Sequence, residues 1–329
     1  MPELPEVESV RRGLSAWLTG STITRARVLD ARILGTTSAR DVPTERVVSF
    51  ERALAGARIA SVERRGKYMW MPLAGAGLAG DRLAGCGEAR DSEAAEVGER
   101  ALAMHLGMSG QARIHEAEDP LHPHTRAVFD VAGPAGVGQL RFVDQRIFGH
   151  LGVERLVPGV AGTPGATGTS GERRLVAESA RGAGLDPFED GFSVPVVART
   201  IARKNVAIKS ALLDQRVVSG VGNIYADEAL FEAGVHPAAR ASRLRISRIE
   251  RVLEAARDVM ERALEVGGTS FDALYVNVNG ESGYFERSLH VYGREGQPCV
   301  RCSTPITRVV LGGRSTHVCE RCQKPQRLR

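Results

Sequence analysis

Apolar residues at the start of the chain recur at the spacing of an α-helix. Pro5 suits a first helical turn, and Gly20 ends the run. The apolar positions between them are Val7, Val10, Leu14, Trp17 and Leu18. Because residues three and four apart share one face of a helix, we predict a leading helix with one apolar face.

The pattern then changes to period two, which is typical of half-buried strands. Short runs rich in β-branched residues are separated by Gly, Pro and charged residues. They lie near residues 22–29, 58–71, 101–114, 126–131 and 137–143. Several short strands with turn residues between them predict an antiparallel sandwich or barrel.

Two stretches of low complexity interrupt these patterns. Residues 74–100 are small and acidic, so we interpret them as a surface insertion within the sheet. Residues 157–175 consist largely of Gly, Pro, Ser and Thr, which is typical of an interdomain linker. Helical spacing returns in residues 195–213, 223–233 and 243–265, which predict a second, helical domain.

Length and composition favour a two-domain protein of the cell interior. The chain has 329 residues, which is long for one domain and comfortable for two. No apolar run approaches the roughly 20 residues of a membrane-spanning helix. Because the N-terminus is acidic and has no apolar signal segment, we expect a cytoplasmic protein.

Positive charge is concentrated at the C-terminus. The chain has a net charge of +5, and residues 294–329 hold eight Lys or Arg side chains against two Glu. This segment therefore accounts for the whole positive surplus. A compact basic terminus suits a polyanion, first of all a nucleic acid. The alternative is a solvated tail that only aids solubility.

Four of the five cysteines lie in this basic segment, at the spacing of a metal site. Two C-x2-C pairs are separated by sixteen residues, enough for a hairpin that brings both pairs to one zinc ion. Two disulfides, which a cytosolic location disfavours, or an iron–sulfur cluster are the alternatives. The predicted ligands are Cys299, Cys302, Cys319 and Cys322. Cys86 is left as an unpaired thiol without a role.

The first residues, MPELPEVES, place reactive groups at the chain start. Removal of Met1 leaves the secondary amine of Pro2 as a free nucleophile. Glu3 and Glu6 lie within one helical turn of that amine, as candidate proton donors. The alternative is ordinary helix-start composition, in which Pro5 and acidic side chains complement the positive end of the helix dipole.

A glycine-rich turn opens the predicted helix in the segment GVGNIYADEALFEAGVHP, residues 220–237. Such a turn can direct backbone N–H groups, the amide of Asn223 and the preceding Lys204 and Lys209 at a phosphate. The alternative is a plain tight turn. Lys67, in the segment RRGKYMW, falls in a predicted strand of otherwise apolar residues, where we expect it to face a cleft or a phosphate.

Two further turns carry side chains that folding alone does not require. HLGMSG (105–110) places Met108 at a predicted hairpin tip, and DQRIFG (144–149) does the same with Arg146 and Phe148. Apolar and planar side chains at loop tips can wedge into a stack of bases. The alternative for each is an ordinary core or rim residue.

Together, these motifs resemble those of the bacterial formamidopyrimidine-DNA glycosylases, base-excision enzymes that remove oxidised purines. The matching segments, in the family's order, are PELPEVE, RRGKY, HLGMSG, HPH, DQRIFG, IKSALLDQ, GVGNIYADEALF, HVYGREGQPC and LGGRSTHVC. The resemblance implies an α+β multidomain fold. Its parts are an N-terminal β-sandwich with a leading helix (1–156), a linker (157–185), a helix-two-turn-helix domain (186–288) and a C-terminal zinc finger (289–329).

The resemblance also implies a mechanism. Pro2 attacks C1′ of the damaged nucleotide, Glu3 is the acid that opens the sugar ring, and Glu6 supports the site. The resulting Schiff base allows β- and then δ-elimination, which cleave both flanking phosphate bonds without an external cofactor. Lys67 is assigned to the elimination and to phosphate contact, and Arg314 contacts the backbone beside the lesion.

Other positions are implied to bind duplex DNA that carries an oxidised base, such as 8-oxoguanine or a formamidopyrimidine. The implied DNA contacts are His122, Arg146, Lys204 and Asn223. The gap left by the extruded base is implied to be filled by Met108, Arg146 and Phe148. We expect a monomer with one structural zinc ion, associated with the nucleoid when it is bound to DNA.

The chain departs from the family pattern in the insertion at 74–100 and in the long linker before residue 185. Residues 277–285 correspond to the segment that grips the lesion base. One alternative function is an endonuclease VIII-like glycosylase for oxidised pyrimidines, but that branch begins PEG rather than PEL. Another is a non-catalytic DNA-binding zinc protein, which the joint presence of Pro2, Glu3, Lys67 and Arg314 disfavours.

Overall fold

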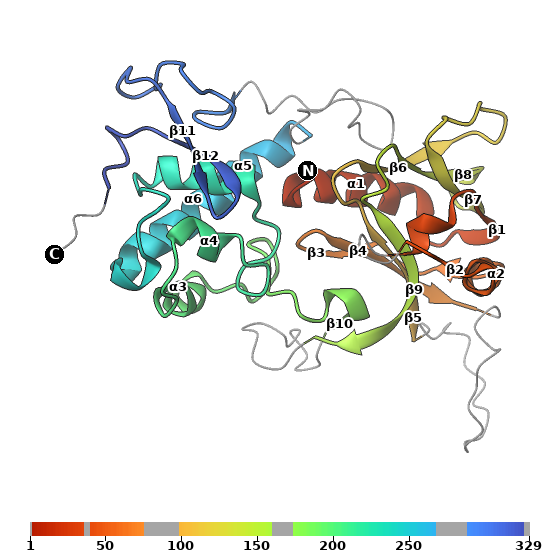
Figure 1. Cartoon of the computed structure of the whole chain (residues 1–329). Coiled ribbons are helices and arrows are strands. Elements are labelled where there is room, and N and C mark those ends of the chain that lie inside the picture. The colour runs from red at the N-terminus through yellow and green to blue at the C-terminus, as the bar shows by residue number, and fades with distance from the viewer. Residues whose placement is uncertain (1, 36–39, 76–98, 160–173, 268–287, 326–329) are drawn as a thin grey trace.

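A computed structural model describes residues 2–35, 40–75, 99–159, 174–267 and 288–325. Cys86, residues 277–285 and most of both low-complexity stretches lie outside the described residues. Among those described, the helices are too short or too polar to cross a lipid bilayer. The strands gather in one half of the molecule and most helices in the other; the first helix runs along the strand half, with its N-terminal end at the junction (Figure 1).

Helix α1 (Leu4–Leu18) begins at Glu3, its N-cap residue, and confirms the predicted leading helix. Its buried apolar side chains include Val7, Val10, Leu14 and Leu18. Trp17, which we assigned to the apolar face, is instead 38% exposed. It lies at the edge of the buried stripe, about 60° around the helix axis from Leu14.

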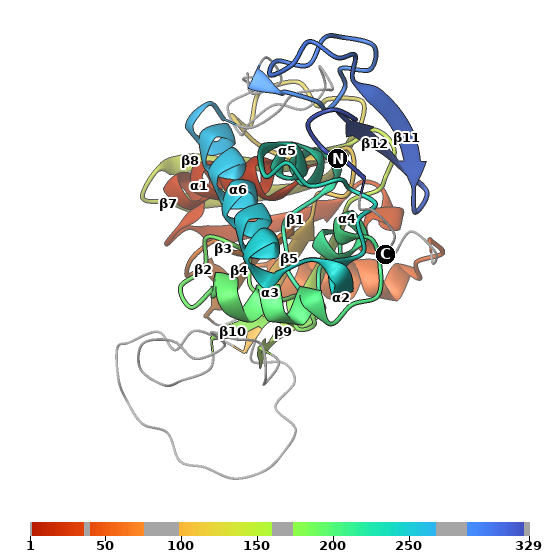
Figure 2. The same cartoon turned by 90° about the vertical axis from the view of Figure 1, so that its left-hand side faces the viewer.

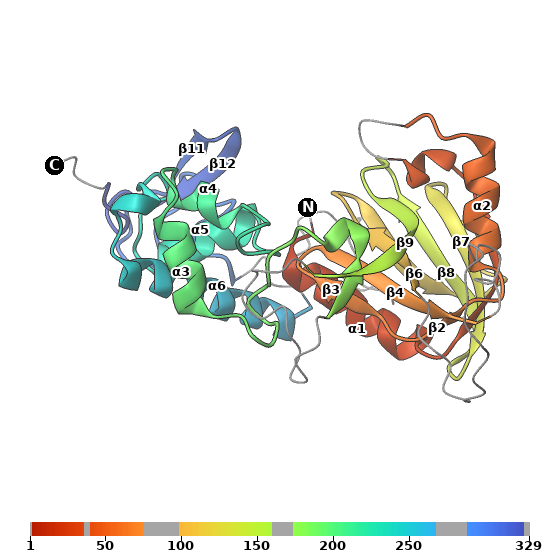
Figure 3. The ribbon, with the colours of Figure 1, turned by 90° about the horizontal axis from the view of Figure 1, so that it is seen from below.

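The strands of the first half form one continuous antiparallel path, in the order β10-β9-β5-β4-β2-β1-β7-β8-β6, with β3 paired to β4. The path curls so that strands from both of its ends, together with α1 and α2, bury one apolar core. Figure 3 shows this layered half beside the helical half. The predicted β-sandwich is confirmed. The strands are β1 (Thr22–Val28), β2 (Arg58–Ile59), β3 (Glu63–Arg65), β4 (Tyr68–Ala74), β5 (Arg100–His105), β6 (Gly110–His115), β7 (Thr125–Gly133), β8 (Gly136–Asp144), β9 (His150–Pro158) and β10 (Leu175–Ala177).

Several boundaries differ from the prediction. The run 58–71 is three strands, interrupted at residues 60–62 and at the turn 66–67, and 101–114 is two strands, interrupted at residues 106–109. Helix α2 (Thr44–Leu54) was not predicted, since only Phe50 and Leu54 of its residues are buried and its apolar stripe is narrow. Short helical turns η1 (Ala31–Leu34), η3 (Glu178–Ala180) and η4 (Ala241–Arg243) were also missed.

The predicted linker 157–185 is wrong for its described C-terminal part. Strand β10 pairs with β9, from Leu175 opposite Pro158 to Ala177 opposite Leu156. Val176 and Ala177 are buried in a small cluster with Trp70. This apolar contact holds the segment against the sheet before the chain enters the helical half.

The helical half consists of α3 (Val194–Ala202), α4 (Ile208–Leu212), α5 (Asn223–Glu232) and α6 (Ile246–Glu265). Helix α6 crosses beside α3 and α5 in Figure 2. The predicted helix 195–213 is broken at residues 203–207, where Ala207 forms an isolated bridge with Arg240. Leu4 of α1 packs in this second core, so α1 joins both halves.

The C-terminal segment is a hairpin of β11 (Thr307–Leu311) and β12 (Arg314–Val318), which lies beside α5 (Figure 2). Its register pairs Thr307 with Val318 and Leu311 with Arg314. A third cluster joins the hairpin base to α5 and contains Phe231, Val291 and Ile306. The tip of the hairpin extends from the helical half, while its base is held in place by this cluster.

Candidate active site and nucleic-acid interface

The start of α1 is buried against the start of α5. Pro2 and Glu3 are both buried, and the Glu3 carboxylate accepts hydrogen bonds from three backbone amides of α5 and its N-cap. The distances are 2.9 Å from Gly222 N, 2.9 Å from Ile224 N and 3.3 Å from Tyr225 N. The first amides of a helix lack intrahelical partners, so they form a site for an anion.

This contact corrects our interpretation of the glycine-rich turn. We expected the turn to direct its amides at a phosphate, but in the structure they bind the Glu3 carboxylate. Glycine is needed at residue 222, because a Cβ there would lie 2.3 Å from the carboxyl carbon of Glu3. The turn thus connects the two halves of the molecule through the residue next to Pro2.

Glu6 completes this arrangement from the next turn of α1. One carboxylate oxygen accepts a hydrogen bond of 2.8 Å from Glu3 N, which closes a capping box. The other carboxylate oxygen accepts a hydrogen bond of 2.7 Å from the Tyr225 hydroxyl. Tyr225 is fully buried and escaped the sequence analysis, because a tyrosine in an apolar helix gives no signal beyond core packing.

Lys67 lies beside the same turn, although not in a strand as we predicted. It occupies the two-residue turn between β3 and β4, after Gly66 with φ of 56°. Its Nζ donates to the Val221 carbonyl at 3.3 Å. A Cβ on Gly66 would lie 2.6 Å from Ser219, so only glycine permits this close approach. The turn brings Lys67 and Glu3 to one buried site.

Burial shifts the protonation of both groups toward their neutral forms. It raises the pKa of Glu3; the charge of Lys67 opposes this rise, and Glu6 adds to it. Burial also lowers the pKa of Lys67, which the charge of Glu3 opposes and that of Arg314 reinforces. Arg314 is therefore close enough to act on this site electrostatically. A proton donor and an amine with shifted pKa values suit acid–base chemistry.

A buried ion network holds the Lys67 turn in place. Asp186 is fully buried; it accepts hydrogen bonds from Gly66 N at 2.9 Å and from Arg64 at 2.7 Å. Arg64 also donates to Glu8 of α1 at 2.9 Å. This network has no signature in the sequence, because its members are charged residues far apart in the chain.

The three predicted void-filling residues gather at one place. Arg146 lies over the Phe148 ring, with its guanidinium carbon 5.3 Å from the ring centroid, and it donates to the Met108 carbonyl at 3.4 Å. Met108 is 39% exposed. Its loop is not a hairpin tip, because β5 pairs with β4 and β9, whereas β6 pairs with β8. Asp144 fixes the second loop, accepting from the amides of residues 146, 147 and 149.

The four cysteines converge at the base of the hairpin. All four Sγ atoms lie within 4.8 Å of one another, with Cys299 and Cys322 at 3.9 Å and Cys302 and Cys319 at 3.5 Å. Sulfurs of a tetrahedral zinc site with Zn–S near 2.3 Å lie about 3.8 Å apart. The donor set and its spacing therefore fit one zinc ion.

Arg314 is exposed at the first position of β12, and the rest of that strand is anchored to the helices. Asn223 Nδ2 donates to the Ser315 carbonyl at 2.9 Å. Lys209, which we considered a phosphate ligand, is instead fully buried in an ion pair of 2.7 Å with Asp227. Its Nζ also donates to Ser315 O and Thr316 Oγ1, so it anchors the hairpin.

His122 and Lys204 make local contacts in the structure. His122 is half-buried in the loop between β6 and β7, and its Nδ1 accepts from His124 N at 3.1 Å. Lys204 follows α3 and forms an ion pair of 2.9 Å with Asp214. Neither contact reaches the Glu3 group directly.

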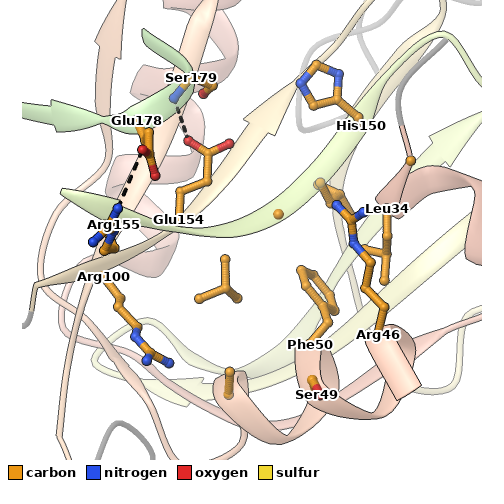
Figure 4. Close-up of a pocket in the computed structure, with 15 residues that line it drawn as sticks. Leu34, Arg46, Ser49, Phe50, Arg100, His150, Glu154, Arg155, Glu178 and Ser179 are labelled. Carbon is orange, nitrogen blue, oxygen red and sulfur yellow. Dashed lines mark hydrogen bonds and ion pairs between the residues drawn. The ribbon is translucent and has the colours of Figure 1, made fainter. Parts of the chain in front are cut away.

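A separate cavity of about 620 Å³ lies between α2 and β9 (Figure 4). None of the residues predicted for the site lines it. Both of its carboxylates are already engaged: Glu154 accepts from Ser179 N at 2.8 Å, and Glu178 lies 3.7 Å from Arg155. The chemistry predicted from the sequence is therefore located away from this cavity.

Three family models match the chain in order. Residues 1–151 match the formamidopyrimidine-DNA glycosylase N-terminal domain, and residues 183–274 match its H2TH domain. Residues 296–325 match a zinc finger found in FPG and IleRS. The third match and the cysteine geometry agree, so the chain has a structural zinc site as predicted.

Known proteins resemble the chain over nearly its full length. Formamidopyrimidine-DNA glycosylase of Corynebacterium efficiens is 43% identical over 98% of this chain and 99% of its own, and that of Nocardioides sp. is 44% identical over 100% and 96%. The Thermus thermophilus MutM (Fpg) structure is 31% identical, with a TM-score of 0.71 over 99% of this chain and 100% of its own. A Lactococcus lactis FPG mutant in complex with Fapy-dG-containing DNA is 26% identical, with a TM-score of 0.74 over 98% and 100%. This chain belongs to the formamidopyrimidine-DNA glycosylase family.

Proposed function

We propose that this protein is a bifunctional DNA glycosylase and AP lyase that excises oxidised purines in base excision repair. The observation that carries this proposal is the buried group formed by Pro2, Glu3, Glu6 and Lys67 at the junction of the two halves. The names of the full-length relatives and the DNA complex of a structural neighbour support the substrate class.

The proposed reaction begins when Met1 has been removed, because Pro2 is otherwise an amide nitrogen without nucleophilicity. The freed secondary amine attacks C1′ of the damaged nucleotide, and the bond between C1′ and the base breaks, so the damaged base leaves. Opening of the sugar ring at O4′ then gives an iminium between Pro2 and C1′, the Schiff base. Glu3, whose pKa is raised by burial, supplies the proton that opens the sugar ring. Glu6 holds the Glu3 backbone through the capping box.

Elimination follows from the electron-withdrawing iminium, which acidifies the C2′ proton. Lys67, whose pKa is lowered by burial, is suited to act near this proton and the adjacent phosphate. Successive β- and δ-elimination then release the two flanking phosphates. The four cysteines hold one structural zinc ion, which fixes the hairpin and takes no part in these steps.

DNA binding is proposed to involve both halves of the molecule. The proposed phosphate and backbone contacts are His122, Arg146, Lys204, Asn223 and Arg314. Met108, Arg146 and Phe148 are proposed to fill the gap of the extruded base, which offsets a few kcal/mol of unstacking. We propose that the protein acts as a monomer on the cytoplasmic chromosome, with a catalytic domain at 1–156, a DNA-binding domain at 186–288 and a zinc finger at 289–329.

Borohydride trapping on a duplex with one 8-oxoguanine tests this proposal. The mature protein is expected to give a covalent adduct, since borohydride reduces the Schiff base to a stable amine. The matched control carries an N-terminal extension before Met1, so that Met1 is not removed and Pro2 stays in an amide bond. This control is expected to give no adduct. An absent adduct with the mature protein, or equal adducts with both, contradicts amine catalysis by Pro2. The first outcome would favour a non-catalytic DNA-binding protein.

A further inference from the structure

We propose that Arg141 is a positioning residue for DNA binding, because its buried guanidinium builds the loop that carries His122. This inference rests on the proposed function, in which His122 contacts the DNA backbone. Arg141 does not itself reach DNA in this proposal, because its side chain is only 1% exposed.

The guanidinium of Arg141 holds the first part of the loop through its carbonyls. Nη1 donates to the Pro120 carbonyl at 3.0 Å, and Nη2 donates to the carbonyls of Glu116 at 3.1 Å and Asp119 at 2.9 Å. Nε donates to the Gln139 side chain at 2.9 Å, which fixes the plane of the group. One side chain thus satisfies three carbonyls of residues 116–120.

The position of Arg141 in the sheet explains this reach. Strand β8 lies between β6 and β7, and the loop 116–124 connects those two outer strands. Arg141 pairs with Arg113 of β6 on one side and with Val128 of β7 on the other. Arg141 therefore lies midway between the two strands that the loop connects. Residues 116–124 of this loop form neither helix nor strand.

The second part of the loop is tied directly to the sheet. Thr125 N donates to the His122 carbonyl at 2.9 Å, and Asp144 N donates to the His124 carbonyl at 2.9 Å. His122 Nδ1 accepts from His124 N. His122 lies between these bonds and Pro120, two residues earlier, so its position depends on both ends of the loop, and Arg141 holds the first.

Only arginine provides this set of bonds. Its planar group has five N–H donors in a fixed fork, whereas lysine offers three donors on one nitrogen. Removal of the fork leaves the loop carbonyls without their donor, and the loop must move to find other partners. The expected consequence is a displaced His122 with the chemistry of Glu3 unchanged.

A double-mutant cycle on a duplex with a non-cleavable abasic analogue tests the proposal. Arg141→Met and His122→Ala are each expected to weaken DNA affinity about tenfold, and the double variant no more than either alone. On a duplex with one 8-oxoguanine and under saturating protein, the single-turnover excision rate of Arg141→Met is expected to equal that of the wild type. The DNA affinity of Arg141→Lys is expected to be close to that of Arg141→Met, since a positive charge alone does not restore the forked set of hydrogen bonds.

Val131→Ala provides the control for lost stability. Val131 is buried in β7 of the same sheet, and its truncation lowers stability without touching the loop. Its DNA affinity is expected to match the wild type at a temperature where every variant is folded. Additive losses in the cycle, or full recovery in Arg141→Lys, would overturn the positioning role. Failure of the wild type to form a borohydride adduct would instead overturn the proposed function.

Discussion

Two charged regions of the molecule differ in burial: the group of Glu3 and Lys67 at the junction of the two halves, and Arg314 on the hairpin. Glu3 and Lys67 are buried, and burial moves the pKa of each toward its neutral form. Arg314, at the hairpin tip, carries an exposed guanidinium group. Yet the charge of Arg314 still affects Lys67.

The difference separates two tasks. Groups that exchange protons work best with pKa values near the working pH, and burial raises the pKa of Glu3 and lowers that of Lys67, each in that direction. A group that only attracts phosphates needs a permanent charge in contact with solvent, since release of counterions drives the binding. In the proposed function, the buried region performs the chemistry and the exposed region provides affinity, so each can be tested separately.

Loss of zinc is the largest expected effect in folding free energy and removes the exposed region. In Cys319→Ser, one ligand is missing, and zinc fingers derive about 10–16 kcal/mol from the metal. The cluster of Phe231, Val291 and Ile306 then opens, and the hairpin no longer holds Arg314. We expect zinc-free protein with DNA affinity reduced at least a hundredfold, about 3 kcal/mol. Metal analysis measures the zinc content, and DNA titration measures the affinity. A zinc-free variant with unchanged DNA affinity would contradict this prediction.

Loss of the Glu3 proton is the next largest effect and acts on the buried region alone. Glu3→Gln keeps an oxygen for the α5 amides but has no acid, so excision is expected to slow about 10²- to 10⁴-fold. Because the Glu3 pKa is raised, wild-type excision should fall as pH rises through that value, and Glu3→Gln should lose this limb. DNA affinity should stay unchanged. A parallel loss of affinity would show that the two regions are not separable.

The ion network that supports the buried region makes stability depend on pH. Burial alone would raise the pKa of Glu8, but Arg11 and Arg64 outweigh it and lower the pKa from 4.5 to about 2. A lowered carboxyl pKa stabilises the fold by about 3 kcal/mol above pH 4.5, and this is lost as pH falls toward 2.

Urea unfolding of Glu8→Gln measures this contribution. The variant is expected to be less stable than the wild type at pH 7, with the difference about half as large at pH 3. Glu63→Gln is the control, because its ion pair with Arg174 is partly exposed, and it should change stability by less than about 1 kcal/mol. An equal pH dependence in both variants would argue against a special role of the Arg64 network.

Truncation of Arg314 is the smallest expected effect and tests the exposed region without unfolding it. Arg314→Ala should weaken DNA affinity about tenfold and reduce the slope of log affinity against log salt by about one. Arg314→Lys keeps the charge and should retain the wild-type slope. A slope that is identical in all three proteins would remove Arg314 from the phosphate contacts.

Much of the fold follows from local patterns. The spacing of Val7, Val10 and Leu14 predicts α1, and the two C-x2-C pairs predict the zinc hairpin. Both patterns can be recognised because each lies within one short segment of the sequence. Helix α2 and strand β10 escaped prediction. Their apolar residues are few, and they are stabilised by contacts with distant strands.

The site was predicted less completely than the fold. Glu3, Glu6 and Lys67 stood out as motif residues, but their partners Tyr225 and Asp186 did not. Those partners lie more than a hundred residues away, and they resemble ordinary core or linker residues in the sequence. Lys209 was misassigned, since only the structure shows its burial against Asp227.

The sequence by itself determined which chemical groups the chain carries and where its local elements begin. It specified a secondary amine behind Met1, acids within one helical turn, a metal-binding hairpin and a basic C-terminus. The tertiary structure decided which groups are buried together, and burial sets their pKa values. Burial raises the pKa of Glu3, whereas the hydrogen bonds from the free amides of α5 oppose this rise, and this contact spans more than two hundred residues of chain.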